Sequence, residues 1–302
     1  MVAPSVKTMS TIERILCPTD FSQFSARAYD YALSLARHYR SELCLQYVLD
    51  FTLSGFAYLA DPIYVRDLFR QVRDKARVQL EDFAKRPTRY GALPERVLCE
   101  GAPAKSILDF AEAQGTNLIV IGSHGLNGTD GVAIGPVAET VTRHAPCSVL
   151  VVGRPAHDFA NRRSAQDPIR ISKLLACTDF STCSMRALEH AIFLAAEYEA
   201  ELTVIHVLEK MPAPGQWENG IRQLVKRIEE WTCPELRGSS IVRSVVRTGE
   251  PYREIVQQAT EEQSDAVIMG VPARNALDLA IFGSTTDRVI QFSPCPVLAV
   301  RP

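Results

Sequence analysis

The residue types and spacings in this chain that suggest chemistry lie in one glycine-rich stretch, GSHGLNGTDGVAIGP, from Gly122 to Pro136. The stretch follows the apolar run LIVI and precedes a segment with helical periodicity. Glycines let the main chain approach phosphate oxygens closely, and N–H groups at a helix N-terminus hold anions without a lysine. The stretch is therefore placed to bind a phosphate group, although a wide turn would also use glycines.

A second place of interest is the motif TDFS, which follows an apolar run at Asp20 and again at Asp179. An aspartate directly after a buried strand can face a ligand at the edge of a sheet. It can equally cap the helix that follows, because carboxylate and hydroxyl oxygens accept the first helical N–H groups. The sequence leaves both interpretations open.

The sequence does not match the motifs of other common reactive sites. GAPAKS at 101–106 lacks the second glycine of G-x4-G-K-[ST], and the histidines show no HExxH spacing. Cys177 and Cys183 are too isolated for a zinc pattern, and eight cysteines without a secretion signal predict reduced thiols. No carboxylate pair or nucleophile with a base is visible. We therefore expect no structural metal and no catalytic residues, and at most slow hydrolysis of a bound ligand.

Two side chains in these loops have two interpretations each. His124 could touch a phosphate or act as a base, and a solvent-exposed loop histidine is the simpler alternative. Arg274 could add positive charge beside a ligand, and a solvated arginine is again simpler.

The chain repeats itself. The segment from Ile15 to Asp50 returns from Leu174 to Glu209 without a gap, at an offset of 159. The segment that ends at Gly122 returns ending at Gly270, at an offset of 148, so the first copy carries 11 extra residues between about 51 and 100. A repeat this long indicates two domains rather than a solenoid.

Short apolar runs alternate with helical periodicity in each copy. Runs that are apolar on consecutive residues are typical of parallel strands buried on both faces. In the first copy the strand candidates are RILCPT, ELCLQYVL, RVLCE, NLIVIG and SVLVVG. Apolar residues at helical spacing are Phe24, Ala28, Tyr31 and Leu35; Val65, Leu68, Phe69, Val72, Ala76, Leu80 and Phe83; and Trp217, Ile221, Leu224, Val225, Ile228 and Trp231.

This alternation predicts two α/β domains, at 12–153 and 171–302, each with an open five-stranded parallel sheet and helices on both faces. Residues 1–11 form an N-terminal tail, and the polar segment 154–170 forms a linker. In such sheets ligands bind beyond the carboxyl ends of the strands, where the strand order reverses. Both glycine-rich loops and both TDFS motifs fall at that edge.

The composition narrows the class of protein. The chain is 46% hydrophobic and 23% charged with a net charge of −2, so it lacks the positive field that nucleic acid or an anionic membrane would need. The N-terminus has no signal-peptide core, and no apolar run approaches the roughly 20 residues that span a bilayer. We expect a cytoplasmic protein without nucleic-acid or membrane partners.

Both copies resemble the universal stress protein family, whose nucleotide-binding members share the pattern G-x2-G-x9-G-(S/T) in this loop. The first copy has Gly122-x2-Gly125-x9-Gly135-Pro136, and the second has Gly270-x2-Ala273-x9-Gly283-Ser284. The flanking segments IGSHG, AETVTRHAPCSVLVV and FGSTTDRVIQFSPCPVLAV also fit. The resemblance covers nearly the whole chain outside the N-terminus and linker. It implies a tandem member with two Rossmann-like domains of the adenine nucleotide alpha hydrolase type.

The resemblance also implies two candidate nucleotide sites. In ATP-binding relatives the aspartate and a valine at the end of the second strand line the adenosine side, and the glycine loop with its terminal hydroxyl holds the phosphates. The first site would comprise Asp20, Val48, Gly122, Gly125, Gly135, Pro136 and Val137. The second would comprise Asp179, Val207, Gly270, Ala273, Gly283, Ser284 and Thr285. The ligand would be ATP or AMP, and its phosphates could be accompanied by a Mg²⁺ ion.

Each copy departs from the family pattern at one residue. Pro136 supplies neither a hydroxyl nor an N–H, and each donor lost to a phosphate is worth about 1.5–3 kcal/mol. Proline is nevertheless favoured at the first position of a helix. Ala273 adds a Cβ where the backbone should approach the ligand, and it is strained if that position needs a positive φ.

Three functions follow. The leading one is a non-catalytic, adenine-nucleotide-binding stress protein that acts as a sensor or regulator through a protein partner. The second is a scaffold or interaction protein whose pockets no longer bind nucleotide. The third is a slow ATPase. The resemblance further implies that SVLVV and PVLAV meet within the chain, which makes the two domains an intrachain pseudo-dimer; dimerisation of whole chains is left open.

Overall fold

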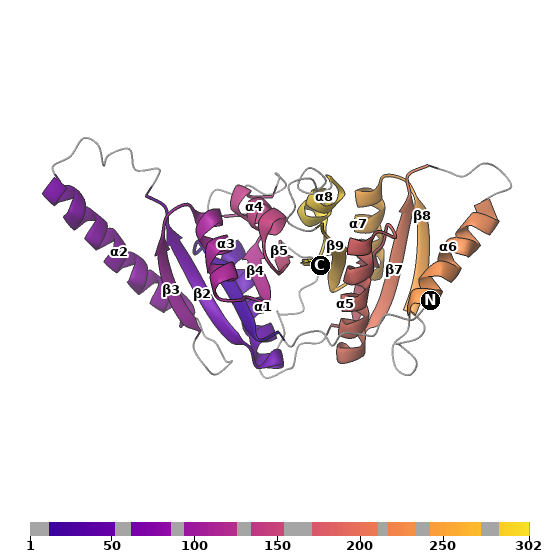
Figure 1. The fold of residues 1–302 in the computed structure, drawn as a ribbon, viewed down its shortest axis with the longest axis horizontal. Helices are drawn as coiled ribbons and strands as arrows, with labels where there is room; N and C mark the ends of the chain where they lie inside the picture. The colour runs from indigo at the N-terminus through magenta and orange to yellow at the C-terminus, as the bar shows by residue number, and fades with distance from the viewer. Residues whose placement is uncertain are drawn as a thin grey trace.

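The computed structural model describes residues 12–51, 62–85, 94–125, 134–153, 171–210, 217–232, 242–272 and 284–301. Strands and helices alternate there in two similar series (Figure 1). The strands are β1 (Arg14–Thr19), β2 (Glu42–Leu49), β3 (Glu95–Glu100), β4 (Leu118–Gly122), β5 (Ser148–Val152), β6 (Lys173–Cys177), β7 (Glu201–Leu208), β8 (Val242–Thr248), β9 (Ala266–Gly270) and β10 (Val297–Val300). The helices are α1 (Gln23–Tyr39), α2 (Pro62–Ala84), α3 (Pro103–Ala113), α4 (Pro136–His144), α5 (Thr182–Tyr198), α6 (Trp217–Thr232), α7 (Pro251–Glu262) and α8 (Ser284–Phe292). The predicted tail 1–11 and linker 154–170 lie outside the described residues.

The described strands form one continuous sheet in the order β3-β2-β1-β4-β5-β10-β9-β6-β7-β8. Within each half the five strands are parallel, which confirms the predicted α/β architecture. The two halves meet at β5 and β10, which pair antiparallel with Val151 opposite Val297. The two segments SVLVV and PVLAV are therefore neighbours in the sheet.

Helices cover both faces of this sheet, and the two halves share each apolar layer. One layer contains buried residues of α1, α2, α5 and α6, such as Ala28, Phe83, Ala187 and Ile228. The other contains buried residues of α3, α4, α7 and α8, such as Ile107, Val141, Ile255 and Val289. Corresponding helices of the two halves therefore lie on the same face of the sheet.

Strand β4 shows why consecutive apolar residues predict a central parallel strand. Leu118 and Val120 belong to the layer on the α1 face, whereas Ile119 and Ile121 belong to the layer on the α3 face. All four side chains are buried. Because alternate side chains point to opposite faces, only an apolar residue at every position can satisfy a sheet covered on both sides.

Helix α2 departs from its predicted burial. Its C-terminal residues Ala76, Leu80 and Phe83 are buried as expected, but Leu68 is 55% exposed and Val72 is 36% exposed. At 1.5 Å per residue, this 23-residue helix is about 35 Å long, whereas a six-residue strand spans about 20 Å. The helix therefore extends past the edge strand β3 (Figure 1), and its N-terminal half has no sheet to pack against.

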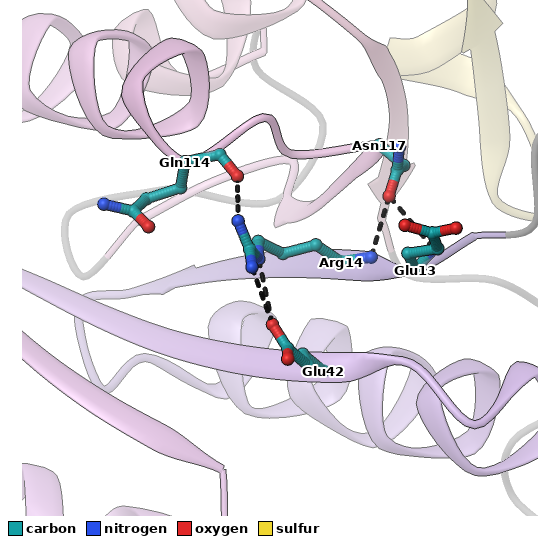
Figure 2. Close-up of polar contacts among 5 residues, drawn as sticks. All are labelled: Glu13, Arg14, Glu42, Gln114 and Asn117. Atoms are coloured by element: carbon teal, nitrogen blue, oxygen red, sulfur yellow. Dashed lines mark hydrogen bonds and ion pairs between the residues drawn. The ribbon is translucent and has the colours of Figure 1, made fainter.

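Polar contacts fix the amino-terminal edge of the first half (Figure 2). The Asn117 Oδ1 atom accepts hydrogen bonds from the N–H groups of Glu13, at 3.0 Å, and Arg14, at 2.8 Å. The Arg14 guanidinium donates to the Glu42 carboxylate at 2.8 Å and also to the carbonyl of Gln114. The side chains of Arg14 and Asn117 thus connect the starts of β1, β2 and β4 with the end of α3.

The second half uses the same contacts with different side chains. Asp265, at the position equivalent to Asn117, accepts from the N–H groups of Ser172 and Lys173 at 2.6 and 2.9 Å. Lys173 replaces Arg14, and its Nζ donates to the Glu262 carbonyl at 3.0 Å. The sequence repeat therefore corresponds to a repeat of structural roles as well as of residues.

The described cysteines carry free thiols, as predicted: Cys17, Cys44, Cys99, Cys147, Cys177, Cys183 and Cys295. Burial raises the pKa of Cys44, Cys147 and Cys295 to about 12. A thiol with so high a pKa stays protonated at neutral pH and acts as a small apolar side chain.

Two glycines at the ends of central strands allow a helix to pass directly over the sheet. A Cβ on Gly122 would lie 2.9 Å from the Phe24 carbonyl carbon, in the first turn of α1. A Cβ on Gly270 would lie 2.3 Å from the Cys183 carbonyl carbon, in the first turn of α5. Backbone atoms of a helix cannot yield cheaply, so these positions require glycine for packing.

We expect Gly122→Ala and Gly270→Ala to destabilise the protein by about 1–3 kcal/mol each, because the added methyl overpacks the contact between helix and strand. Gly153→Ala is the matched control, since among the described residues its Cβ would meet the Ser123 Oγ at an ordinary 3.6 Å. Denaturant unfolding of the three variants measures the difference. Equal midpoints for all three would show that the helices can shift without cost.

Candidate functional site

The carboxyl ends of β1 and β4 mark the point where the strand order reverses in the first half. Strand β1 pairs with β2 on one side and with β4 on the other. The chain leaves β1 toward one edge and returns to the sheet at β4, so the two connections diverge there. Open α/β sheets bind ligands in this crevice. The corresponding point of the second half lies between β6 and β9.

The turn from β1 into α1 is held by its own side chains. Asp20 Oδ1 accepts the N–H of Ser22 at 3.0 Å, and Ser22 Oγ accepts the N–H of Ser25 at 3.1 Å. Ser22 is therefore the N-cap of α1, and the hypothesis that Asp20 is the cap is wrong. The aspartate instead orients the cap residue, because its carboxylate binds the backbone of Ser22.

Gly125 approaches this aspartate closely. A Cβ at position 125 would lie 2.7 Å from Asp20 Oδ2, which is inside van der Waals contact. The glycine-rich loop and the TDFS motif, more than one hundred residues apart in sequence, are therefore brought together at the strand ends. Only glycine at 125 leaves the carboxylate in this position.

Gly135 and Pro136 begin helix α4. Gly135 is the N-cap, and its N–H donates to the Ser123 carbonyl at 2.8 Å, which closes the two ends of the loop on each other. No side chain caps α4, whereas Ser22 caps α1. Pro136 occupies the first helical turn without disturbing the helix, as predicted, and the partly buried Val137 follows it.

Val48 lies near the carboxyl end of β2. Thr19 pairs with Tyr47, so continuing the register by one residue places Val48 level with Asp20. Val48 is 9% exposed and belongs to the apolar layer beneath α3 and α4. It therefore contributes an apolar wall on the strand next to the aspartate.

The structure shows an aromatic pair beside Asp20 that the sequence pattern did not predict. Phe21 has a φ of 65°, a left-handed conformation that is rare for a bulky residue. This conformation places its ring 4.4 Å from that of Tyr47. In the second half Phe180 also has a φ of 65°, and its ring lies 4.7 Å from that of His206. The recurrence of phenylalanine in both TDFS motifs is the signal that could have identified the pair.

The loop histidine contacts Ser123 and α1. His124 Nδ1 lies 2.8 Å from Ser123 Oγ, and the ring packs 5.1 Å from the ring of Phe24. The simple exposed histidine of the sequence interpretation is therefore wrong, because the side chain is half-buried against α1. The hydrogen bond and the ring contact fix the imidazole within the loop.

Comparisons with known proteins identify the family of this chain. The family model described as the universal stress protein family matches residues 11–153 and again residues 170–301. The chain belongs to the universal stress protein family. Its two domains of this family confirm the resemblance that the motifs indicate.

Individual relatives each match one domain's length. A universal stress protein of Methanocaldococcus jannaschii is 32% identical over 145 residues, which are 43% of this chain and 81% of the relative. The universal stress protein YxiE of Bacillus subtilis is 29% identical over 145 residues, covering 46% of this chain and 97% of the relative. A solved universal stress protein from Archaeoglobus fulgidus matches 96% of this chain and 97% of its own with a TM-score of 0.70 at 22% identity, which shows the shared fold.

In this universal stress protein the turn from β6 into α5 repeats the turn from β1 into α1. Asp179 Oδ1 accepts the N–H of Ser181 at 2.9 Å, and Ser181 is the N-cap of α5. Val207 is half-buried on β7, and α8 begins at Ser284 and Thr285. Ala273, Arg274 and Gly283 lie outside the described residues.

Two further observations bear on function. In the described part of the chain, no group of three or more histidine, cysteine, aspartate or glutamate side chains could hold a metal ion. No helix in the described ranges has the length and apolarity needed to cross a membrane.

A cavity of about 530 Å³ lies at the other edge of the first sheet, lined by residues that include Arg14, Arg40 and Phe110. The Arg14 guanidinium is bound there to Glu42 and to the Gln114 carbonyl. Ligands of this architecture bind at the carboxyl edge, so this cavity is separate from the candidate site.

The environment of Asp179 predicts a pH dependence. Burial alone would raise the pKa of its carboxyl, but hydrogen bonds from Ser181 and Ser184 outweigh burial and hold the pKa below its usual 3.8. An acid with a depressed pKa stabilises the fold above its usual value, and this stabilisation is lost as the pH falls through the lower pKa of the folded state. We expect the unfolding free energy of Asp179→Asn to depend less on pH below about 4 than that of the original chain. Asp109→Asn, at an exposed carboxylate on α3, is the control. If the unfolding free energies of the original chain and both variants change with pH in parallel, the lowered pKa of Asp179 is contradicted.

Proposed function

We propose that this universal stress protein binds an adenine nucleotide, ATP or AMP, at the carboxyl edge of its first domain. The proximity of Gly125 to Asp20 carries the proposal, since it joins the phosphate-type loop to the adenosine-side aspartate of the family pattern. Asp20 and Val48 would line the adenosine. Gly122, Gly125, Gly135, Pro136 and Val137 would form the loop and helix start around the phosphates.

The two helix N-termini at this edge differ in a way that supports phosphate binding to α4. The Ser22 hydroxyl already occupies the start of α1. The N-cap of α4 is Gly135, which has no side-chain oxygen to offer. A phosphate near the first turn of α4 would be stabilised by the main-chain N–H groups and the helix dipole. Mg²⁺, when present, would accompany the phosphates.

The second domain would hold a second site built from Asp179, Val207, Gly270, Ala273, Gly283, Ser284 and Thr285. Ser284 at the start of α8 supplies the hydroxyl that Pro136 lacks. The Cβ of Ala273 would restrict how closely the backbone can approach the ligand at this position of the family pattern. We propose that the first site retains the fuller glycine pattern and the second retains the fuller donor set.

We further propose that the bound state acts through a protein partner in a stress response, without catalysis. The two domains would form an intrachain pseudo-dimer joined by β5 and β10. Three further features stay predictions: the domain limits at 12–153 and 171–302, a cytoplasmic location, and a homodimer of whole chains.

One observation favours the alternative of a scaffold without nucleotide. Gly122 and Gly270 are required for helix packing whether or not a ligand binds, so their presence alone is no sign of a binding site. Under this alternative the loops would be structural and the purified protein would carry no nucleotide.

Mass spectrometry of small molecules released from the purified protein separates these functions, followed by calorimetric titration with ATP and with AMP. We expect a co-purified adenine nucleotide or a saturable binding isotherm. A ligand-free protein that does not bind millimolar ATP would support the scaffold.

Substitution of the two loop ends identifies the working site. We expect Pro136→Ser to tighten ATP binding about tenfold or more, because the serine adds an N–H and a hydroxyl that can donate to a phosphate. Pro103→Ser makes the same change in the first turn of α3 and is the matched control. If Ser284→Ala weakens ATP binding instead and Pro136→Ser changes nothing, the second domain is the site.

A further inference from the structure

Helix α4 of the first domain contacts the second domain at both ends of the second glycine-rich loop. Pro272 precedes that loop, and α8 follows it from Ser284. Two arginines make these contacts: Arg301, directly after β10, and Arg143, in the last turn of α4. In Figure 1, α4 and α8 lie next to each other above the junction of the two halves.

Arg301 joins the start of the loop to the end of α4. Its guanidinium donates to the carbonyls of Thr142, at 2.8 Å, and Arg143 in the last turn of α4. The same guanidinium donates to the carbonyl of Pro272. The residue is only 7% exposed, so these carbonyls replace the water that its charge would otherwise bind. A buried arginine that satisfies helix C-terminal carbonyls also interacts favourably with the helix dipole.

Arg143 joins the end of the loop to the same helix. Its Nη2 atom lies 2.9 Å from Glu139 Oε1 in α4 and 2.5 Å from Asp287 Oδ2 in the first turn of α8. Burial raises the pKa of Asp287, and the Arg143 guanidinium opposes that rise. An ionised carboxylate in the first turn of α8 would repel a phosphate bound there, and the arginine offsets its charge.

The positions equivalent to these two arginines hold other residue types at the first loop. The repeat offset of 148 places Gly153 opposite Arg301 and Gln291 opposite Arg143. Neither glycine nor glutamine can supply a guanidinium to the first domain's loop. The arrangement is therefore directional. The first domain contributes Arg143 and the last carbonyls of α4 to the support of the second loop, and Arg301 of the second domain binds those carbonyls. The equivalent residues Gly153 and Gln291 cannot make these contacts for the first loop.

We propose that Arg143 and Arg301 are positioning residues of the second-domain nucleotide site, and that α4 of the first domain is a structural part of that site. The inference rests on the proposed function. The ligand would be the same adenine nucleotide, and the arginines would act on it through Pro272 and Asp287 rather than by contact.

Calorimetric titration with ATP tests each site separately. Asp20→Ala disables the first site and reports the second, and Asp179→Ala disables the second and reports the first. We expect Arg143→Gln, and independently Arg301→Gln, to weaken ATP about tenfold or more in the Asp20→Ala chain and to leave the Asp179→Ala chain unchanged. Arg143→Lys, which keeps the charge, should recover most of the loss. Arg253→Gln is the control, since this exposed arginine of α7 pairs locally with Glu250 and Tyr252.

The outcomes are distinguishable. Equal weakening at both sites, or at neither, would overturn the inference and leave the proposed function intact. An Asp20→Ala chain that binds no ATP while the Asp179→Ala chain does would overturn it as well, because no second site would exist. A parent chain that does not bind ATP would overturn the proposed function together with the inference.

Discussion

The antiparallel pairing of β5 and β10 is the interaction on which the rest of this structure depends. Each strand would be an exposed, apolar edge in an isolated domain, and Val151, Val297 and Ala299 are each at most 1% exposed once the strands meet. Such edges otherwise recruit other chains. Pairing them within one chain merges the apolar layers of the two halves and brings α4 beside α8. The contacts between the domains, including those of Arg143 and Arg301, exist because of this junction.

A duplicated chain can place different residues at equivalent positions on either side of its junction. His38 and Glu197 occupy equivalent positions and lie 3.1 Å apart, and the ring of His38 stacks on that of Tyr198 at 4.7 Å. Two identical subunits would bring like residues together there, whereas the tandem chain pairs a histidine with a carboxylate. Arg143 and Gln291 differ in the same way. Duplication thus permits one domain to become a support for the other.

The glycines of the family pattern have separate physical reasons. Gly122 and Gly270 admit the first turn of a helix, Gly125 makes room for the Asp20 carboxylate, and Gly135 begins α4 and closes the loop on Ser123. Only the last two would bear directly on a ligand at the proposed site. A motif match therefore combines packing requirements with binding requirements, and the structure is needed to separate them.

The sequence by itself determined the repeat, the parallel α/β architecture and the edge of the sheet where the motifs gather. It could do so because apolar residues at every position of a strand, such as Leu118 to Ile121, are compatible only with a sheet covered on both faces. Other features were decided by tertiary structure, because they depend on distances between residues far apart in the chain. This group includes the cap at Ser22 rather than Asp20 and the exposure of Leu68 beyond the sheet edge. It also includes the ring contact of Phe21 with Tyr47 and the two arginines between the domains. Local pattern specifies which faces must be buried, whereas only the packed chain determines which side chain meets which.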